Sequence, residues 1–145
     1  MAKKHIVSVS HDYNVPREEV FAVIADPYKL AEINSFNIER IKDSTGDDVN
    51  GVGSVKRLKM GFFSKIDEVV TEFDVPELIE YRVLTGIPVK NHVGRMTFVD
   101  LGNGRSRVEF LIHFESKYPG FGGMLRLGLE QAVKASVINI ENYLK

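Results

Sequence analysis

Histidine is the residue type of this 145-residue chain best suited to acid–base or metal chemistry near neutral pH. The four histidines are scattered: His5, His11, His92 and His113 form neither an i,i+4 pair nor a His-Glu-x-x-His motif. The absence of cysteine excludes disulfides, thiolate zinc sites, iron–sulfur clusters and cysteine nucleophiles. We therefore expect no metal and no other cofactor, and we find no catalytic motif.

Alternating sequence patterns place several polar side chains on apolar faces. His11 lies within one alternating series, which Tyr13 ends, Tyr81 lies within a second and His92 begins a third. An inward histidine is more often a hydrogen-bonded wall residue than a catalyst, and inward tyrosines are equally well explained as core residues with backbone-bonded hydroxyls. We expect a ligand pocket lined by His11, Tyr13, Tyr81, His92, Met96, Phe98, Phe110, Leu125 and Leu129.

Three other features have structural explanations. Asp67 is predicted to lie on the same face of its strand as Phe73, and a buried carboxylate there would be a candidate base. Because Asp67 is near the start of the strand, an exposed position at the rim of the pocket is favoured. The motif Gly51-Val52-Gly53 lacks the Gly-Lys-Ser/Thr of a phosphate-binding loop, and the strand pattern after it favours a hairpin turn. The segment 117–123 is either a lid or an ordinary glycine-rich connection.

These side chains need a particular set of strands and helices to position them. Residues 5–13 alternate as a half-buried strand, and Asp26-Pro27 ends one short helix and begins another. Further strands are predicted over 36–42, 54–60, 66–75, 79–84, 92–100 and 107–115, and a broad apolar stripe predicts a long helix over 121–145. The order predicts an α+β fold, in which a curved antiparallel sheet of seven strands wraps around the C-terminal helix.

The same order of elements resembles the helix-grip arrangement of the START-domain and polyketide-cyclase superfamily (SRPBCC), which includes birch-pollen-allergen-like proteins. The resemblance rests on residues 14–21, 25–30, 50–55, 72–76 with 81–83, and 102–108. Their sequences are NVPREEVF, ADPYKL, NGVGSV, EFDVP with YRV, and GNGRSRV. The resemblance covers nearly the whole chain and implies two short helices after the first strand and a ligand cavity between the sheet and the last helix.

Composition narrows the remaining choices. Hydrophobic residues make up 43% and charged residues 27% of the chain, so extensive disorder is excluded. The net charge of −1 speaks against nucleic acid as a partner, and the longest apolar run, 20–25, is too short to span a membrane. Without a signal-peptide pattern, we expect one cytoplasmic ligand-binding domain over residues 1–145.

Three functions remain open at this point. The first is a non-catalytic binder of a small hydrophobic molecule such as a lipid, a polyketide or an aromatic compound. The second, which the resemblance implies, is a polyketide cyclase, aromatase or dehydratase in which His11, Tyr81 or His92 would supply acid–base groups. The third is a protein-interaction module whose cavity has become filled core.

Overall fold

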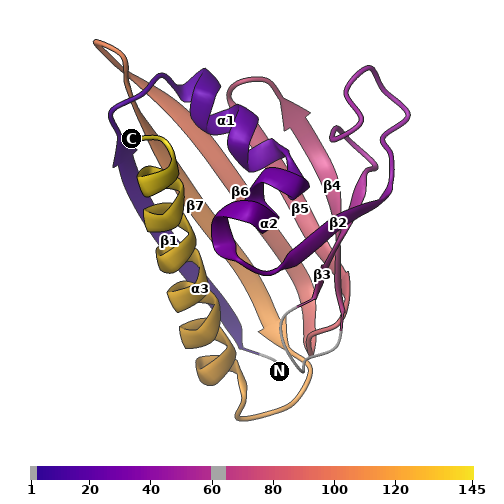
Figure 1. Ribbon diagram of the computed structural model, residues 1–145. Coiled ribbons are helices and arrows are strands. Elements are labelled where there is room, and N and C mark those ends of the chain that lie inside the picture. Colours follow the sequence, from indigo (N-terminus) through magenta and orange to yellow (C-terminus); the bar gives the residue numbers. More distant parts are fainter. Residues whose placement is uncertain (1–2, 60–64) are drawn as a thin grey trace.

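A single antiparallel sheet of seven strands forms the body of the protein in the computed structural model, which describes residues 3–59 and 65–145. The strands lie in the order β1-β7-β6-β5-β4-β3-β2. Their bounds are β1 Lys4–Tyr13, β2 Asn37–Lys42, β3 Val55–Lys59, β4 Ile66–Asp74, β5 Leu78–Thr85, β6 Val89–Gly102 and β7 Arg105–Ser116. The helices are α1 Arg17–Ala25, α2 Pro27–Asn34 and α3 Gly122–Tyr143. This arrangement confirms the helix-grip fold, because the sheet curves around all three helices (Figure 1).

Asp26 separates the two short helices, as the sequence predicts. Its Oδ1 accepts hydrogen bonds from the backbone N–H groups of Tyr28 (2.9 Å) and Lys29 (3.4 Å) at the start of α2. Pro27 occupies the first turn, where its missing N–H costs nothing. Asp26 itself has an extended backbone, so it ends α1 and caps α2 at once.

The longest hairpin, β6–β7, turns at Gly102, Asn103 and Gly104, all of which have positive φ. Glycine and asparagine are the residues that adopt this conformation with least strain, which explains why this turn could be located in the sequence. Two predictions involve residues outside the described ranges. The strand predicted over 54–60 ends at Met60, and a turn was predicted at Gly61.

Helix α3 packs on the concave face through Val133, Val137 and Ile140, which are buried. It runs alongside β1 and β7, while α1 and α2 cover the upper part of the same face (Figure 1). Two apolar clusters result, one beneath α3 and one around α1 and α2. Among the helices of the described chain, none is long and apolar enough to cross a membrane.

Candidate functional site

A cavity of about 200 Å³ lies between the concave face of the sheet, the α2–β2 connection and α3. Most of its wall is hydrocarbon, and it receives side chains from every layer of the fold. Its lining residues are Ile24, Leu30, Asn34, Phe36, Ile38, Lys56, Leu58, Ile66, Glu68, Tyr81, Val83, Ile87, His92, Met96, Phe110, Ile112, Leu129, Ala132, Val133, Ser136, Val137 and Ile140. An apolar concavity with a few polar groups is the usual form of a small-molecule site.

Four polar side chains cross the cavity wall on four adjacent strands, and we call Lys56, Glu68, Tyr81 and His92 the polar row. Lys56 on β3 pairs in register with Glu68 on β4, and their Nζ and Oε1 atoms are 3.7 Å apart. The Lys56 ammonium also lies 5.7 Å from the centre of the Tyr81 ring. The Tyr81 and His92 rings are 5.5 Å apart, so the row is continuous.

Tyr81 owes its position to a glycine on the neighbouring strand. Tyr81 on β5 pairs with Gly94 on β6, and a Cβ atom at position 94 would lie 2.3 Å from the ring carbon Cζ. No other residue type leaves this space empty, so the tyrosine ring lies flat across the backbone of β6. The Tyr81–Gly94 pair therefore holds the tyrosine ring and its hydroxyl over the backbone of β6, along the cavity wall.

Burial changes the acidity of three members of the polar row. Burial raises the pKa of Glu68 above its ordinary value, although the adjacent Lys56 ammonium opposes this. Burial, together with the charge of Glu68, raises the pKa of Tyr81 well above its ordinary value, so its hydroxyl stays protonated. Burial lowers the pKa of His92 to about 4, and the imidazole is therefore neutral at neutral pH.

The hydrogen bonds of His92 determine which of its nitrogens carries the proton. The backbone N–H of Val83 donates to Nδ1 of His92 (3.2 Å), so the neutral ring must hold its proton on Nε2. Lys56 Nζ, the Tyr81 hydroxyl and His92 Nε2 are then three donors on one wall, with Glu68 as the acidic member between them. This row can bind an oxygen acceptor, such as a carbonyl or carboxylate, on an otherwise apolar molecule.

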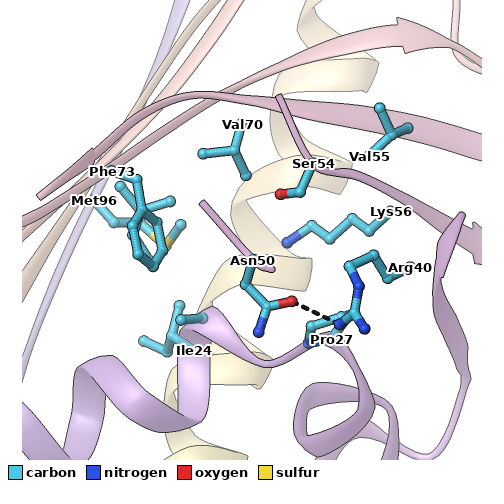
Figure 2. Close-up of a pocket in the computed structure, with 12 residues that line it drawn as sticks. Ile24, Pro27, Arg40, Asn50, Ser54, Val55, Lys56, Val70, Phe73 and Met96 are labelled. Carbon is cyan, nitrogen blue, oxygen red and sulfur yellow. Dashed lines mark hydrogen bonds between the residues drawn. The ribbon is translucent and has the colours of Figure 1, made fainter. Parts of the chain in front are cut away.

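A smaller hollow of about 20 Å³ adjoins the cavity and shares Ile24, Lys56 and Met96 with it. Figure 2 shows the Lys56 ammonium pointing into this hollow, near Asn50. Arg40 donates a hydrogen bond to Oδ1 of Asn50 (2.9 Å), which holds the loop before β3 against the wall. The hollow has room for about one water molecule. Lys56 therefore lies between the main cavity and this water-sized hollow.

The structure brings five of the nine residues expected from the sequence to the cavity wall: Tyr81, His92, Met96, Phe110 and Leu129. The other four pack around it. His11 Nε2 lies 2.5 Å from Glu141 Oε1 of α3, and the Tyr13 hydroxyl donates to the backbone oxygen of Val137 (3.0 Å). Phe98 packs on Phe21, and Leu125 packs against the apolar cluster beneath α3.

Lys56 and Glu68 are the two charged side chains of the wall, and the site residues expected from alternation did not include them. The β4–β5 register shifts between Val70 and Glu72, so the parity counted back from Phe73 is reversed at Glu68. Asp67 consequently lies off the cavity wall and accepts two hydrogen bonds from Arg57, at 2.8 and 2.9 Å. The signal that could have found the pair is the opposite charge of Lys56 and Glu68 across one predicted hairpin.

Comparisons with known proteins agree with this fold. The START superfamily protein from Mycobacterium smegmatis has a similar structure, with a TM-score of 0.81, 16% identity and 96% of each chain covered. Norcoclaurine synthase from Thalictrum flavum, in complex with dopamine and hydroxybenzaldehyde, has a TM-score of 0.76 at 14% identity, covering 99% of this chain and 87% of that one. Ara h 8.0201 has a TM-score of 0.76 at 16% identity, with 97% of each chain covered.

At these identities, the structural similarity establishes the fold. Among curated proteins, no significant sequence match was found. Residues 4–145 match the family described as "Polyketide cyclase / dehydrase and lipid transport", which is nearly the whole chain. The helix-grip sheet, the cavity beneath α3 and this match together mean that the chain belongs to the polyketide cyclase/dehydrase and lipid transport family, within the SRPBCC superfamily.

Proposed function

We propose that residues 1–145 act as one domain that binds a small, mainly hydrophobic molecule carrying an oxygen acceptor. The observation that carries this proposal is the apolar cavity of about 200 Å³ with the polar row along one wall. An engineered apolar cavity of about 150 Å³ holds benzene. A ligand with one ring and a carbonyl or carboxylate substituent therefore suits the space.

The two parts of the wall have different roles in this proposal. Contact with Met96, Phe110 and Leu129 supplies affinity, at about 25 cal/mol for each Å² of apolar surface removed from water. Tyr81 and His92 supply selectivity, because a donor left unpaired by a ligand without oxygen loses its bond to water. The aromatic aldehyde bound to the similarly folded norcoclaurine synthase supports this ligand class.

Acetophenone and isopropylbenzene form a matched pair of ligands, since they have similar size and only the first has an oxygen acceptor. We expect NMR titration of the purified protein to show tighter binding of acetophenone. Tyr81→Phe should weaken acetophenone binding about threefold to tenfold and leave isopropylbenzene unchanged. Tyr118→Phe is the control, because Tyr118 is exposed. Equal binding of both ligands would contradict the role of the polar row.

A second pair of variants tests the cavity itself. Leu129→Trp adds bulk to a lining residue and should abolish binding of both ligands, whereas Leu127→Trp adds the same bulk to an exposed position two residues away. Native mass spectrometry of gently purified protein would show whether a small molecule copurifies. Binding that survives Leu129→Trp would refute the cavity as the ligand site.

A cyclase or dehydratase is the alternative function, and Glu68 is the observation that favours it. A carboxyl group with a raised pKa beside Tyr81 can donate a proton to a bound carbonyl oxygen or to a leaving hydroxyl group. Mass spectrometry of mixtures with poly-β-carbonyl compounds would detect loss of water. Product that disappears in Glu68→Gln would support an enzyme, and recovery of unchanged bound compound would support a binder.

A further inference from the structure

One end of the molecule exposes a compact series of apolar side chains. Tyr118, Phe121, Met124 and Leu127 lie in the β7–α3 connection and the first turns of α3, and between 50% and 68% of each residue's surface is accessible. We call these four residues the apolar tip. Further along α3, Val133, Val137 and Ile140 are buried, whereas Ile138 and Tyr143 are exposed singly, so neighbouring exposed apolar side chains gather where the helix begins.

Three lysines lie beside the apolar tip, at the end that carries Tyr118. Lys3, Lys90 and Lys117 line a groove of about 480 Å³ that also includes Tyr118 and the first residue of α3, Gly122. We call it the lysine groove. The backbone N–H of Lys117 donates to the carbonyl of Pro88 (2.9 Å), which ties the β7–α3 connection to the start of β6. The N-terminal end of β1 lies at this same end of the molecule (Figure 1).

Acidic side chains near this end already have partners. Glu115 accepts a hydrogen bond from Asn91 (2.6 Å), and Glu130 is bound by Arg126 (2.6 Å) and Lys134 (3.0 Å). Asp12, Asp74 and Asp100 lie near the last residues of β1, β4 and β6, towards the other end of the molecule. Asp12 is itself paired with Arg107 (2.6 Å), so the feature that distinguishes the near end is the group of three lysines in the groove.

We propose that the apolar tip and the lysine groove dock the protein on an anionic membrane surface. Apolar side chains flanked by lysines are the combination that inserts at the boundary between headgroups and acyl chains. The lysines face lipid phosphates while Phe121 and Met124 enter the interface. A second copy of the chain is a poorer occupant, because a symmetric contact would bring the lysine grooves of two copies together.

Docking in this orientation would place one end of the cavity near the bilayer. Ile87 and Leu129 line the cavity and belong to the segments next to the lysine groove and the apolar tip. A hydrophobic ligand that partitions into lipid could then reach the cavity over a short path. The docking proposal goes beyond ligand binding and is tested separately, since it concerns surface residues outside the cavity wall.

The first experiment is sedimentation of the full chain with phosphatidylcholine vesicles, with and without phosphatidylserine. We expect binding only when phosphatidylserine is present, and we expect salt to weaken it. The double variant Lys90→Ala/Lys117→Ala should lose about fivefold for each lysine, or about thirtyfold in total. Lys42→Ala, an exposed lysine at the end of β2, is the control. Binding that is equal for both vesicle types would overturn the proposal.

The second experiment uses the absence of tryptophan from this chain. Met124→Trp places a single reporter in the apolar tip, and Ile138→Trp places one on the same helix at a similarly exposed position further along. We expect anionic vesicles to shift the emission of the first variant to the blue and to leave the second unchanged. A shift in both variants, a shift in neither, or a shift that appears with protein concentration alone would refute the docking surface.

The variants Phe121→Ser and Met124→Ser separate docking from ligand binding. Both residues are exposed, so we expect normal thermal unfolding, unchanged acetophenone binding and loss of sedimentation with anionic vesicles. If the unmodified protein did not bind acetophenone, the ligand-binding proposal would fail and the docking proposal would be unaffected. Sedimentation that persists in both serine variants would overturn the role of the apolar tip.

Discussion

The neutral state of His92 predicts a specific dependence of stability on pH. In the folded protein, burial holds the pKa of His92 at about 4, whereas an unfolded histidine titrates near 6.5. Between these values the unfolded chain binds more protons than the folded one. Stability is therefore full above pH 6.5 and is lost as the pH falls from 6.5 towards 4.

The size of the effect follows from the two pKa values. Relative to pH 7, the free energy of unfolding should fall by about 2 kcal/mol at pH 5 and by about 3 kcal/mol at pH 4 from His92 alone. The physical cause is the wall around the ring, because protonation places a charge among apolar groups and removes the Nδ1 acceptor that binds the Val83 N–H. Other titrating groups add their own contributions, so the comparison needs a variant.

Urea unfolding at pH 7, 5 and 4 provides the assay, with the protein compared with His92→Asn. Asparagine does not titrate and retains an acceptor, and the contribution of Glu68 should largely cancel in the comparison. We expect the pH dependence to be smaller by about 2 kcal/mol at pH 5 in the variant. Equal losses in the protein and in His92→Asn, or an NMR titration of His92 near 6.5, would refute the reasoning.

Three further predictions concern the packing of the helix and the wall. Ile140→Ala, at a buried position of α3, should lower the free energy of unfolding by about 2–5 kcal/mol. Ile138→Ala, at an exposed position of the same helix, should change it little. Similar effects of both substitutions would contradict the helix register. Glu68→Leu should destabilise the protein by up to about 3 kcal/mol because Lys56 loses its partner, and Lys56→Met/Glu68→Leu should restore most of that loss, as measured in the same unfolding assay. Tyr13→Phe should lower the free energy of unfolding by about 1 kcal/mol through loss of the bond to Val137, and no change would show that this bond contributes no net stability.

Local patterns determined the order of elements because each signal lies within a few neighbouring residues. Asp26-Pro27 marks a helix boundary by the geometry of proline and the acceptor of aspartate, and Gly102-Asn103-Gly104 marks a turn by positive φ. Neither signal needs a tertiary contact. The parity of Tyr81 also placed it on the cavity wall, because β5 pairs regularly with β6 from Leu78 to Tyr81, and His92 keeps the parity of Met96 although the β6–β7 register shifts between Lys90 and Val93.

Parity along a strand identifies a face, but it cannot show what covers that face. His11 and Tyr13 share the inward parity of β1, yet α3 lies directly over them and takes up both side chains, through Glu141 and the Val137 carbonyl. Where the cavity begins therefore depends on the path of a helix that is distant in sequence. No spacing within β1 contains that information.

The polar row is likewise a product of strand pairing. A register shift in β4 turns Glu68 inward, and only the β3–β4 pairing brings Lys56 opposite to it. The sequence alone determined the fold, the turns and an apolar wall with Tyr81 and His92, because these follow from local conformational preferences and alternation. The tertiary structure decided which carboxylate faces the ligand space and which lysine accompanies it, because a single extra residue in one strand reverses every side chain before it.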